Sequence, residues 1–135
     1  MSFTGNFTSN AFKTALLEGG VDFGSDTLKI ALYDNTATLD QTTDVYTTVG
    51  EVVASGYTAG GLVLIPSVAA LDGVSFVSFD NVSWSGAITA RGALIYKLFG
   101  TAVCVLDFGA DRTSTTTFTV AFPPASNTSA ILRLQ

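Results

Sequence analysis

The stretch AITARGALIYKLFGTAVCVLDFG, residues 87–109, decides the fold that the sequence predicts. It holds two apolar runs, Ala93–Tyr96 and Ala102–Leu106, with the turn-prone segment Leu98–Thr101 between them. Each run is rich in β-branched or aromatic residues and is too short for a typical helix. Because successive side chains of a strand point to opposite sides, both faces of each run are apolar. The pattern predicts a central β-hairpin that is buried on two sides.

Further apolar runs on either side of this hairpin predict the rest of a mainly β fold. They are Thr27–Tyr33, Leu62–Ile65, Val68–Leu71, Val74–Phe79, Asn81–Ser85, Thr117–Phe122 and Ala130–Leu134. Parallel βαβ units would need many helices, and only one helical segment is indicated. The sequence therefore predicts an antiparallel β-sandwich or flattened barrel of about eight short strands.

Local patterns add detail to four of these strands. Thr27–Tyr33 places its larger apolar side chains on one face, so we expect good cover on that side only. Pro66 is expected to end the strand before it. Asp72–Gly73 is a strong signal for a two-residue hairpin turn. In Val74–Phe79 the alternation slips, which predicts a β-bulge near Phe76–Val77. After the central hairpin, residues 111–115 are expected to enter a polar loop.

One segment near the N-terminus has the pattern of a helix. Ser9 or Asn10 can cap it, and Gly19–Gly20 ends it, because glycine adopts the conformation that terminates helices. A helix this short is unstable alone in water, so its apolar face must dock on the sheet. We expect residues 1–20 to form an N-terminal extension of one domain that spans residues 1–135.

A polar segment, Asp34–Val49, is long for an ordinary connection, and loops of this length are usually functional or mobile. Leu39 and Val45 are its isolated apolar anchors. Downstream, Glu51–Val53 is expected to form a short helical turn or an edge segment. Gly56–Gly61 is expected to be a turn, since its three glycines can adopt positive φ.

Composition excludes several classes of function. Charged residues make up 13% of the chain, against about 25% in a typical soluble protein, and Thr (19) and Ser (12) take their place. The net charge is −5 and the six basic residues are scattered, so neither nucleic acid nor an acidic membrane is an expected partner. Low charge favours a homo-oligomer or another covered surface, and the alternative is simply a Thr-rich surface on a soluble β-protein.

The single cysteine, Cys104, lies inside an apolar run, where a free thiol behaves as a small hydrophobic group. A nucleophilic cysteine needs an activating base, usually His, and the chain has no histidine. Cys104 is therefore expected to be a buried core residue. The first residues lack the basic and apolar regions of a signal peptide, and no apolar run is long enough to span a bilayer.

Carboxylates offer two candidate sites, and the sequence favours neither. Asp34, Asp40 and Asp44 share one loop, but their spacing does not match a calcium-binding loop, so a solvated acidic loop is expected. Glu51 and Asp107 could form a hydrolytic pair, but no feature places them at the required separation. The sequence thus assigns no catalytic, cofactor-binding or metal-ligating residue, and we expect no enzyme activity.

Two arginines lie among apolar residues, where a buried guanidinium needs a carboxylate partner. Arg91 and Arg133 are therefore expected to form structural ion pairs or partner contacts. Asp107 and Glu51 are the plausible carboxylate partners.

Three segments carry a resemblance to a known group of proteins. They are YTTVGEV (Tyr46–Val52), GYTAGG (Gly56–Gly61) and ARGALIY (Ala90–Tyr96). With the Thr-rich strand near the C-terminus, they make the chain resemble small proteins encoded by tailed bacteriophages, over about residues 28–134. Such proteins are generally regarded as virion structural components. The turn Lys97–Thr101 is short where relatives often carry a longer insertion, which puts any partner contact through that loop in doubt.

The resemblance implies a bacteriophage virion structural protein, made in the bacterial host cytoplasm and carried in the virion. A capsid decoration or cement protein, bound to the major capsid protein, is the leading expectation. The alternatives are a tail, neck or fibre-associated virion protein, and a host-surface module that binds carbohydrate or a receptor through Asp34–Val49. Because Phe3, Phe7 and Phe12 have no assigned strand, deleting Met1–Thr8 is expected to weaken particle binding and leave the domain folded.

Overall fold

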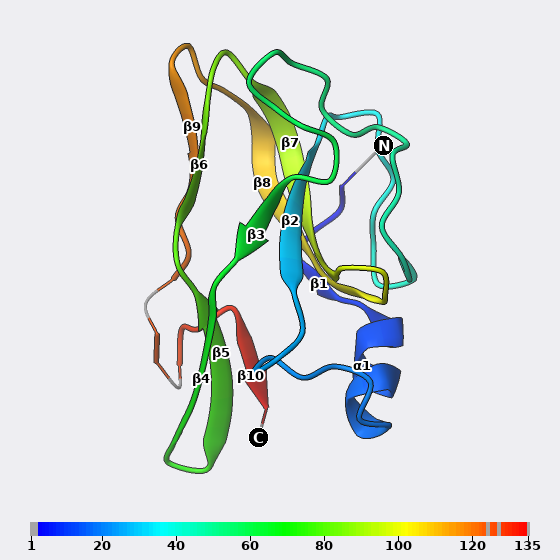
Figure 1. The fold of residues 1–135 in the computed structure, drawn as a ribbon, viewed down its shortest axis with the longest axis vertical. Helices are drawn as coiled ribbons and strands as arrows, with labels where there is room; N and C mark the ends of the chain where they lie inside the picture. Colours follow the sequence, from blue (N-terminus) through cyan, green and yellow to red (C-terminus); the bar gives the residue numbers. More distant parts are fainter. Residues whose placement is uncertain (1–2, 124, 127, 135) are drawn as a thin grey trace.

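The computed structural model of the chain describes residues 3–123, 125–126 and 128–134. Within them lie one helix, α1 (Asn10–Leu17), and ten strands (Figure 1). The strands are β1 (Phe7–Thr8), β2 (Leu28–Tyr33), β3 (Leu62–Leu64), β4 (Pro66–Leu71), β5 (Val74–Phe79), β6 (Val82–Ser85), β7 (Thr89–Lys97), β8 (Ala102–Thr113), β9 (Thr117–Val120) and β10 (Leu132–Leu134).

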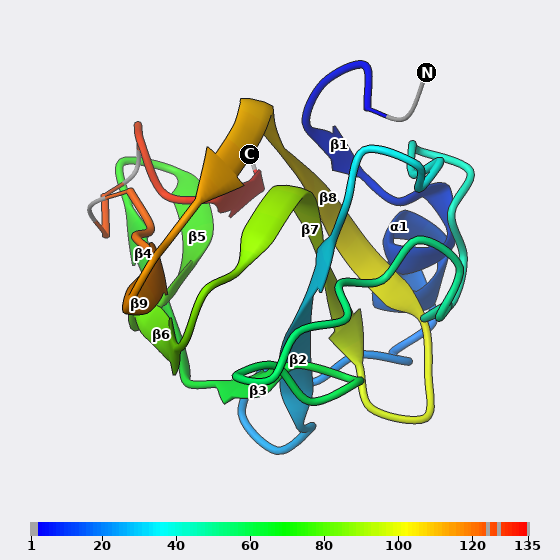
Figure 2. The ribbon, with the colours of Figure 1, turned by 90° about the horizontal axis from the view of Figure 1, so that it is seen from above.

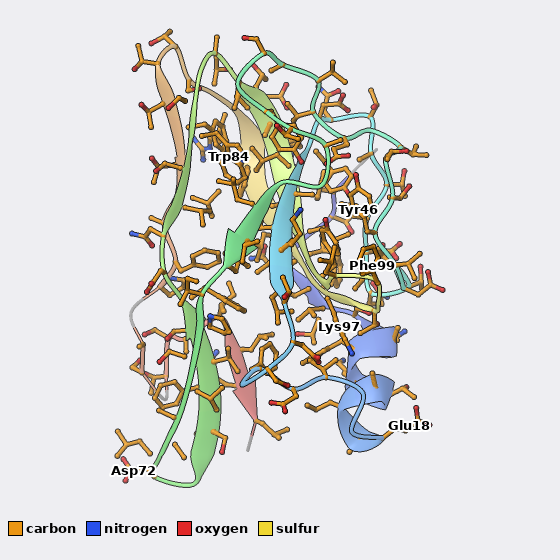
Figure 3. The ribbon with its side chains drawn as sticks, in the orientation of Figure 1. Glu18, Tyr46, Asp72, Trp84, Lys97 and Phe99 are labelled. Carbon is orange, nitrogen blue, oxygen red and sulfur yellow. The ribbon has the colours of Figure 1, made fainter. Side chains whose placement is uncertain are left out.

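The predicted central hairpin is confirmed as β7 and β8. Both belong to an antiparallel five-stranded sheet with the order β1-β8-β7-β2-β3, so each has a neighbour on both edges. The apolar side chains of Ala93–Tyr96 and Ala102–Val105 are almost completely buried. The hairpin turn carries Phe99 at its tip, where the ring is exposed (Figure 3).

A second layer of two smaller antiparallel sheets faces this hairpin. One has the order β10-β5-β4, and the other pairs β6 with β9. Seen from above, β4, β5, β6 and β9 lie on one side of the molecule, with β1 and β2 on the other (Figure 2). None of the sheets in the described residues closes into a barrel. The predicted mainly β, antiparallel fold with one short N-terminal helix is confirmed.

Apolar side chains fill both faces of the five-stranded sheet. The core between the layers includes Ile30, Ile95, Val77 and Trp84. A second core, on the outer face, contains Phe3, Ala31, Tyr33, Ala37, Leu39, Leu94, Tyr96, Ala102 and Val105. The expectation that the first long strand is covered on one side only was therefore wrong. Its second face is closed by the N-terminus and by the segment after Tyr33, which folds back over the sheet.

The segment after β2 is thus a cover for the sheet. Of its two predicted anchors, Leu39 is buried and Val45 is more than half exposed. Glu51 does not enter a helical turn, because it forms an antiparallel bridge to Tyr33, while the Val52 N–H donates to the Leu32 carbonyl oxygen. The alternative of an edge segment is confirmed.

The helix begins and ends as predicted. The Ser9 hydroxyl accepts a hydrogen bond from the Phe12 N–H at 3.2 Å, which caps the first turn. At the other end, the Gly20 N–H donates to the Ala15 carbonyl oxygen and the Gly19 N–H to that of Leu16. These two bonds satisfy carbonyls that the helix leaves without partners.

The N-terminal phenylalanines are used inside the chain. Phe3 and Phe12 are buried, one in each core, and Phe7 pairs with Val105 as part of β1. All three rings expected to reach a partner therefore already have internal contacts, since Phe7 also packs against the outer core. Removal of Met1–Thr8 would take Phe3 and β1 with it, so the expectation that this deletion leaves the domain intact is corrected. Residues 1 and 2 lie outside the described residues.

The hairpin of β4 and β5 corrects two further expectations. Its predicted turn is confirmed, since Asp72 and Gly73 have φ of 52° and 79°, the positive pair that a tight two-residue hairpin turn needs. The strand before Pro66 ends as predicted, at Leu64, but the next strand, β4, begins at Pro66 and not at Val68. The expected bulge near Phe76–Val77 is absent, because the pairing of β4 with β5 is regular along its whole length. Phe76, Val77 and Phe79 are all buried, so the strand is covered on both faces and needs no bulge.

The register shifts lie in the central hairpin instead, at Arg91 and near Val103. β8 also continues through Thr113, so most of the expected polar loop is strand. Further on, β9 alternates exposed and buried residues as predicted, and the last strand is shorter than expected. Pro124, part of the predicted strand end, lies outside the described residues.

Candidate functional site

A buried carboxylate, Glu51, accepts three hydrogen bonds from groups on two other parts of the chain. Its Oε1 accepts a hydrogen bond from the Tyr46 hydroxyl at 2.5 Å. Its Oε2 accepts one from the Tyr57 hydroxyl at 2.5 Å and one from the Gly60 N–H at 2.7 Å. The Tyr96 hydroxyl donates to the Gly60 carbonyl oxygen at 2.6 Å. These five residues are called the Glu51 network.

The Glu51 network joins the three segments that carry the phage resemblance. Tyr46 and Glu51 come from the first, Tyr57 and Gly60 from the second, and Tyr96 from the third. Tyr46 lies between the covering segment and the sheet (Figure 3), and its ring stacks on that of Tyr96 with centroids 4.8 Å apart. Segments separated by up to fifty residues thus meet at one carboxylate.

Burial governs the chemistry of these tyrosines. Desolvation raises the pKa of the Tyr96 hydroxyl to about 12, with a further contribution from the negative charge of Glu51. Desolvation and the hydrogen bond to Glu51 also raise the pKa of Tyr46 and Tyr57. The Tyr57 hydroxyl in turn accepts from the Leu32 N–H at 3.0 Å. Because both carboxylate oxygens already hold donors, the arrangement serves to tie the covering segment to the sheet.

A second polar cluster lies at the register shift around Arg91, where β8 carries the extra residues. Arg91 forms an ion pair with Asp107 of β8, one of the two carboxylates that the sequence offered as its partner, and both side chains are mostly buried. Desolvation tends to raise the pKa of the Asp107 carboxyl. The hydrogen bond from Arg91, the N–H of Gly109 and the arginine charge outweigh it, so this pKa lies below its ordinary value. The Asn6 side-chain oxygen accepts from the Asp107 N–H at 2.6 Å.

Glu51 and Asp107 are not brought together. Glu51, Tyr33, Gly92 and Asp107 form one row across neighbouring strands. Strands lie about 4.8 Å apart, which separates the Cα atoms of the two acidic residues by about 14 Å. Catalytic carboxyl pairs lie about 5 to 9.5 Å apart, and these two are engaged with different partners.

Two of the three loop aspartates, Asp34 and Asp40, accept hydrogen bonds from their own segment through their carboxylates, whereas Asp44 accepts through its backbone carbonyl, from the Ala102 N–H at 2.8 Å. Asp34 Oδ1 accepts from the Thr36 N–H at 2.8 Å, and Asp40 Oδ1 accepts from the Thr42 N–H at 2.8 Å. These turns hold each carboxylate beside its own segment. In the part of the chain that the structure describes, no group of three or more acidic or thiol side chains converges as metal ligands would.

Cys104 and Arg133 are the remaining residues for which the sequence predicted a role. Cys104 is buried, as predicted, and burial raises the pKa of its thiol to about 12. Arg133 is exposed and donates to the Thr128 carbonyl oxygen. The predicted carboxylate partner for Arg133 is not found among the described side chains. No helix in the described ranges is long and apolar enough to cross a membrane.

The most unusual surface is a strand segment without charge. No residue from Val52 through Leu71 is charged. This stretch includes β3 and β4, each at the edge of its sheet, and residues 62–71 are called the edge segment. Four large apolar side chains along it are more than half exposed: Val63, Ile65, Val68 and Leu71. Natural proteins usually protect such edges with charge or proline, and here Pro66 alone stands in the segment.

A groove of about 600 Å³ adjoins the edge segment, and Val68 lines it. Its walls come from α1 on one side and from β5 and β10 on the other, with Phe12, Leu16 and Phe76 among the apolar contributors. Lys13 and Arg133 also lie on these walls. The groove extends the apolar surface from β4 toward the helix.

Comparison with known proteins returned no match for this chain among protein-family models, curated proteins or solved structures.

Proposed function

We propose that the chain is a bacteriophage virion structural protein, and that it acts as a decoration or cement protein on the capsid. In this role it is not an enzyme. It stabilises the particle through protein–protein contacts with the major capsid protein and with other copies of itself. Its place of action is the virion, after synthesis in the host cytoplasm.

The edge segment is the observation that carries this proposal. It offers exposed apolar side chains beside unpaired backbone groups, and it lacks the charges that keep edges apart. Such an edge pairs readily with another chain. A surface of this kind suits a protein whose natural state is assembled, because neighbours then supply the missing cover.

The polar clusters support a structural role. Glu51 and Arg91 bind other groups of this chain, so the segments that carry the phage resemblance also hold the fold together. Many weak contacts of such small subunits become collectively strong on a lattice. The covering segment between Asp34 and Gly50 packs on the sheet, which leaves the edge segment as the better docking surface.

Co-sedimentation with purified particles tests the proposal. Capsids assembled without this protein and isolated tails of the encoding phage are each mixed with purified protein. We expect saturable binding to capsids and none to tails. Binding to tails alone would move the protein to the tail, and binding to neither would overturn the virion role.

A charge-matched pair of variants tests the edge segment itself. The double variant Val63→Lys/Ile65→Lys places two charges on the edge and is expected to lose capsid binding. The control, Leu17→Lys/Phe99→Lys, adds the same charge at two exposed apolar positions on α1 and on the β7–β8 turn. Circular dichroism confirms that both fold. Equal capsid binding by the two variants would contradict the role of the edge segment.

A further inference from the structure

Among the described residues β4 lies at the edge of its sheet, and its free side has a defined set of backbone groups without a partner strand. The Asp80 N–H donates to the Ile65 carbonyl oxygen at 3.2 Å, which makes these two residues a hydrogen-bonded pair of the β4–β5 ladder. In an antiparallel ladder such pairs alternate with pairs whose backbone groups point away. Pro66, Val68 and Ala70 therefore direct their backbone groups outward, away from β5.

The hairpin turn indicates independently which residues of β4 are hydrogen-bonded to β5. Leu71 and Val74 flank the two-residue turn at Asp72–Gly73, and the residues that flank such a turn bond to each other. Counting back from Leu71 by twos, Ala69 and Ser67 bond to β5, and the residues between them face outward. Both observations leave the same groups without a partner strand.

Pro66 reduces the number of outward N–H donors on the free edge of β4, because proline has no N–H. Only Val68 and Ala70 keep both an outward N–H and an outward carbonyl. These two residues lie symmetrically about Ala69, so the free edge is complementary to itself when a second copy runs antiparallel to it.

We propose that a second copy of this chain pairs with the edge of β4 around a two-fold axis at Ala69. Val68 then lies opposite Ala70 of the partner subunit, and the reverse pair completes the symmetry. Each pair exchanges two hydrogen bonds. The two three-stranded sheets become one six-stranded sheet.

Pro66 decides which register the two β4 strands adopt. A two-fold axis at Val68 would set Pro66 opposite the partner's Ala70, whose carbonyl oxygen would then face a residue without an N–H. The axis at Ala69 instead satisfies every outward N–H and carbonyl of Val68 and Ala70.

Charge does not oppose a second copy as the occupant, because the edge segment is uncharged. Each chain carries a net charge of −5, but none of it lies on the edge segment. Asp72 is the nearest acidic side chain, at the tip of the hairpin (Figure 3). In the proposed register the two Asp72 residues lie at opposite ends, about 20 Å apart, well beyond the screening length of about 8 Å in physiological salt.

This inference rests on the proposed function only for its biological purpose, since it names the surface through which the virion protein would self-assemble.

Disulfide trapping tests the register. Ala69 lies on the axis in a pair that is not hydrogen-bonded, where Cα atoms are about 4.5 Å apart and a disulfide can form. The Ala69→Cys variant should form a covalent dimer under mild oxidation, while native Cys104 stays buried.

Two cysteine variants serve as controls. In the proposed register, Ser67 and its symmetry mate lie about 14 Å apart, so the Ser67→Cys variant should stay monomeric on a non-reducing gel. The Val68→Cys variant reports the alternative axis. We expect at least tenfold more covalent dimer for Ala69→Cys than for either control. More dimer for Val68→Cys would overturn the register, and equal trapping of all three or of none would overturn the pairing.

A proline variant tests the hydrogen bonds. Ala70→Pro removes an N–H that the monomer does not use, and it should abolish the dimer in analytical ultracentrifugation while circular dichroism stays native. Ala70→Ser keeps the N–H and should dimerise like the parent. A dimeric Ala70→Pro variant would contradict the inference. A monomeric parent that still binds capsids would overturn the inference and leave the proposed function intact, and a dimer that binds no particle would do the opposite.

Discussion

The aromatic ring of Phe3 occupies the space directly above Gly92, at the centre of the five-stranded sheet. A Cβ atom at position 92 would lie 2.3 Å from Phe3 Cε2 and 2.5 Å from the Leu106 carbonyl oxygen. The Arg91 guanidinium carbon lies 5.6 Å from the centre of the same ring. Phe3 therefore fits against β7 because Gly92 has no side chain, and the neighbouring Arg91 cation contacts the same ring.

This contact predicts that Gly92→Ala destabilises the protein. The new methyl group must displace the Phe3 ring or shift β8, which costs about 1–3 kcal/mol in a well-packed core. Urea unfolding of the single variants and of Phe3→Ala/Gly92→Ala measures the coupling of the two positions. Part of the cost of Gly92→Ala should vanish when Phe3 is absent. Strictly additive costs would show that the ring does not depend on Gly92.

The Glu51 network predicts a cost for removing a single hydroxyl. Tyr57→Phe leaves the buried Leu32 N–H without its acceptor and takes a donor from Glu51. An unsatisfied buried group costs about 1–3 kcal/mol, so this variant should lose that much stability in urea. Tyr46→Phe removes one hydrogen bond from a less buried ring and serves as the comparison. Equal losses for both variants would argue against the double role of Tyr57.

The raised tyrosine pKa values predict alkaline unfolding. Burial, together with Glu51, holds the pKa of Tyr96 near 12 and raises the pKa of Tyr46 and Tyr57. The unfolded chain releases these protons near pH 10, and the folded chain keeps them to higher pH. The stability that the protonated hydroxyls contribute is therefore complete below pH 10 and is lost as pH rises toward the folded values.

Tyrosinate absorbance and circular dichroism, followed together from pH 8 to 13, check this prediction. We expect the two signals to change in one cooperative step above pH 10. Gradual ionisation near pH 10 with unchanged circular dichroism would mean that the hydroxyls are accessible to solvent in the folded protein.

The burial of Cys104 predicts that its thiol reacts slowly in the native protein. Its side chain is buried and its pKa is raised to about 12, so the reactive thiolate is scarce at neutral pH. A thiol reagent should label the denatured protein quickly and the native protein slowly, as followed by absorbance. Equal rates in the two states would remove Cys104 from the core.

Local sequence patterns predicted the strands with apolar runs or alternating apolar and polar residues, and they predicted the cap and the turn that depend on particular residue types. The run around Ile95 and Val103, the Ser9 cap and the Asp72–Gly73 turn all follow from rules that act over a few residues. A carboxylate partner for Arg91 was also expected, with Asp107 and Glu51 as the two candidates, because a guanidinium among apolar residues needs a carboxylate.

The errors arose where distant segments decide the outcome. The second face of β2 is buried by Phe3 and by the segment around Leu39, neither of which its own alternation reveals. In β5, apolar residues of both parities suggested a bulge, but cover on both faces accommodates them without one. The Glu51 network was missed, since its members come from three segments. A lone Glu near several tyrosines and glycines was its only signal.

Quantitative gel densitometry of purified virions tests the central claim most directly. A decoration protein should be present at on the order of hundreds of copies per particle, because a capsid lattice repeats its binding site that often. The band of this protein, calibrated against the major capsid protein, should reach that level. A dozen copies or fewer would place the protein in the tail or neck, and its absence from washed virions would contradict the structural role.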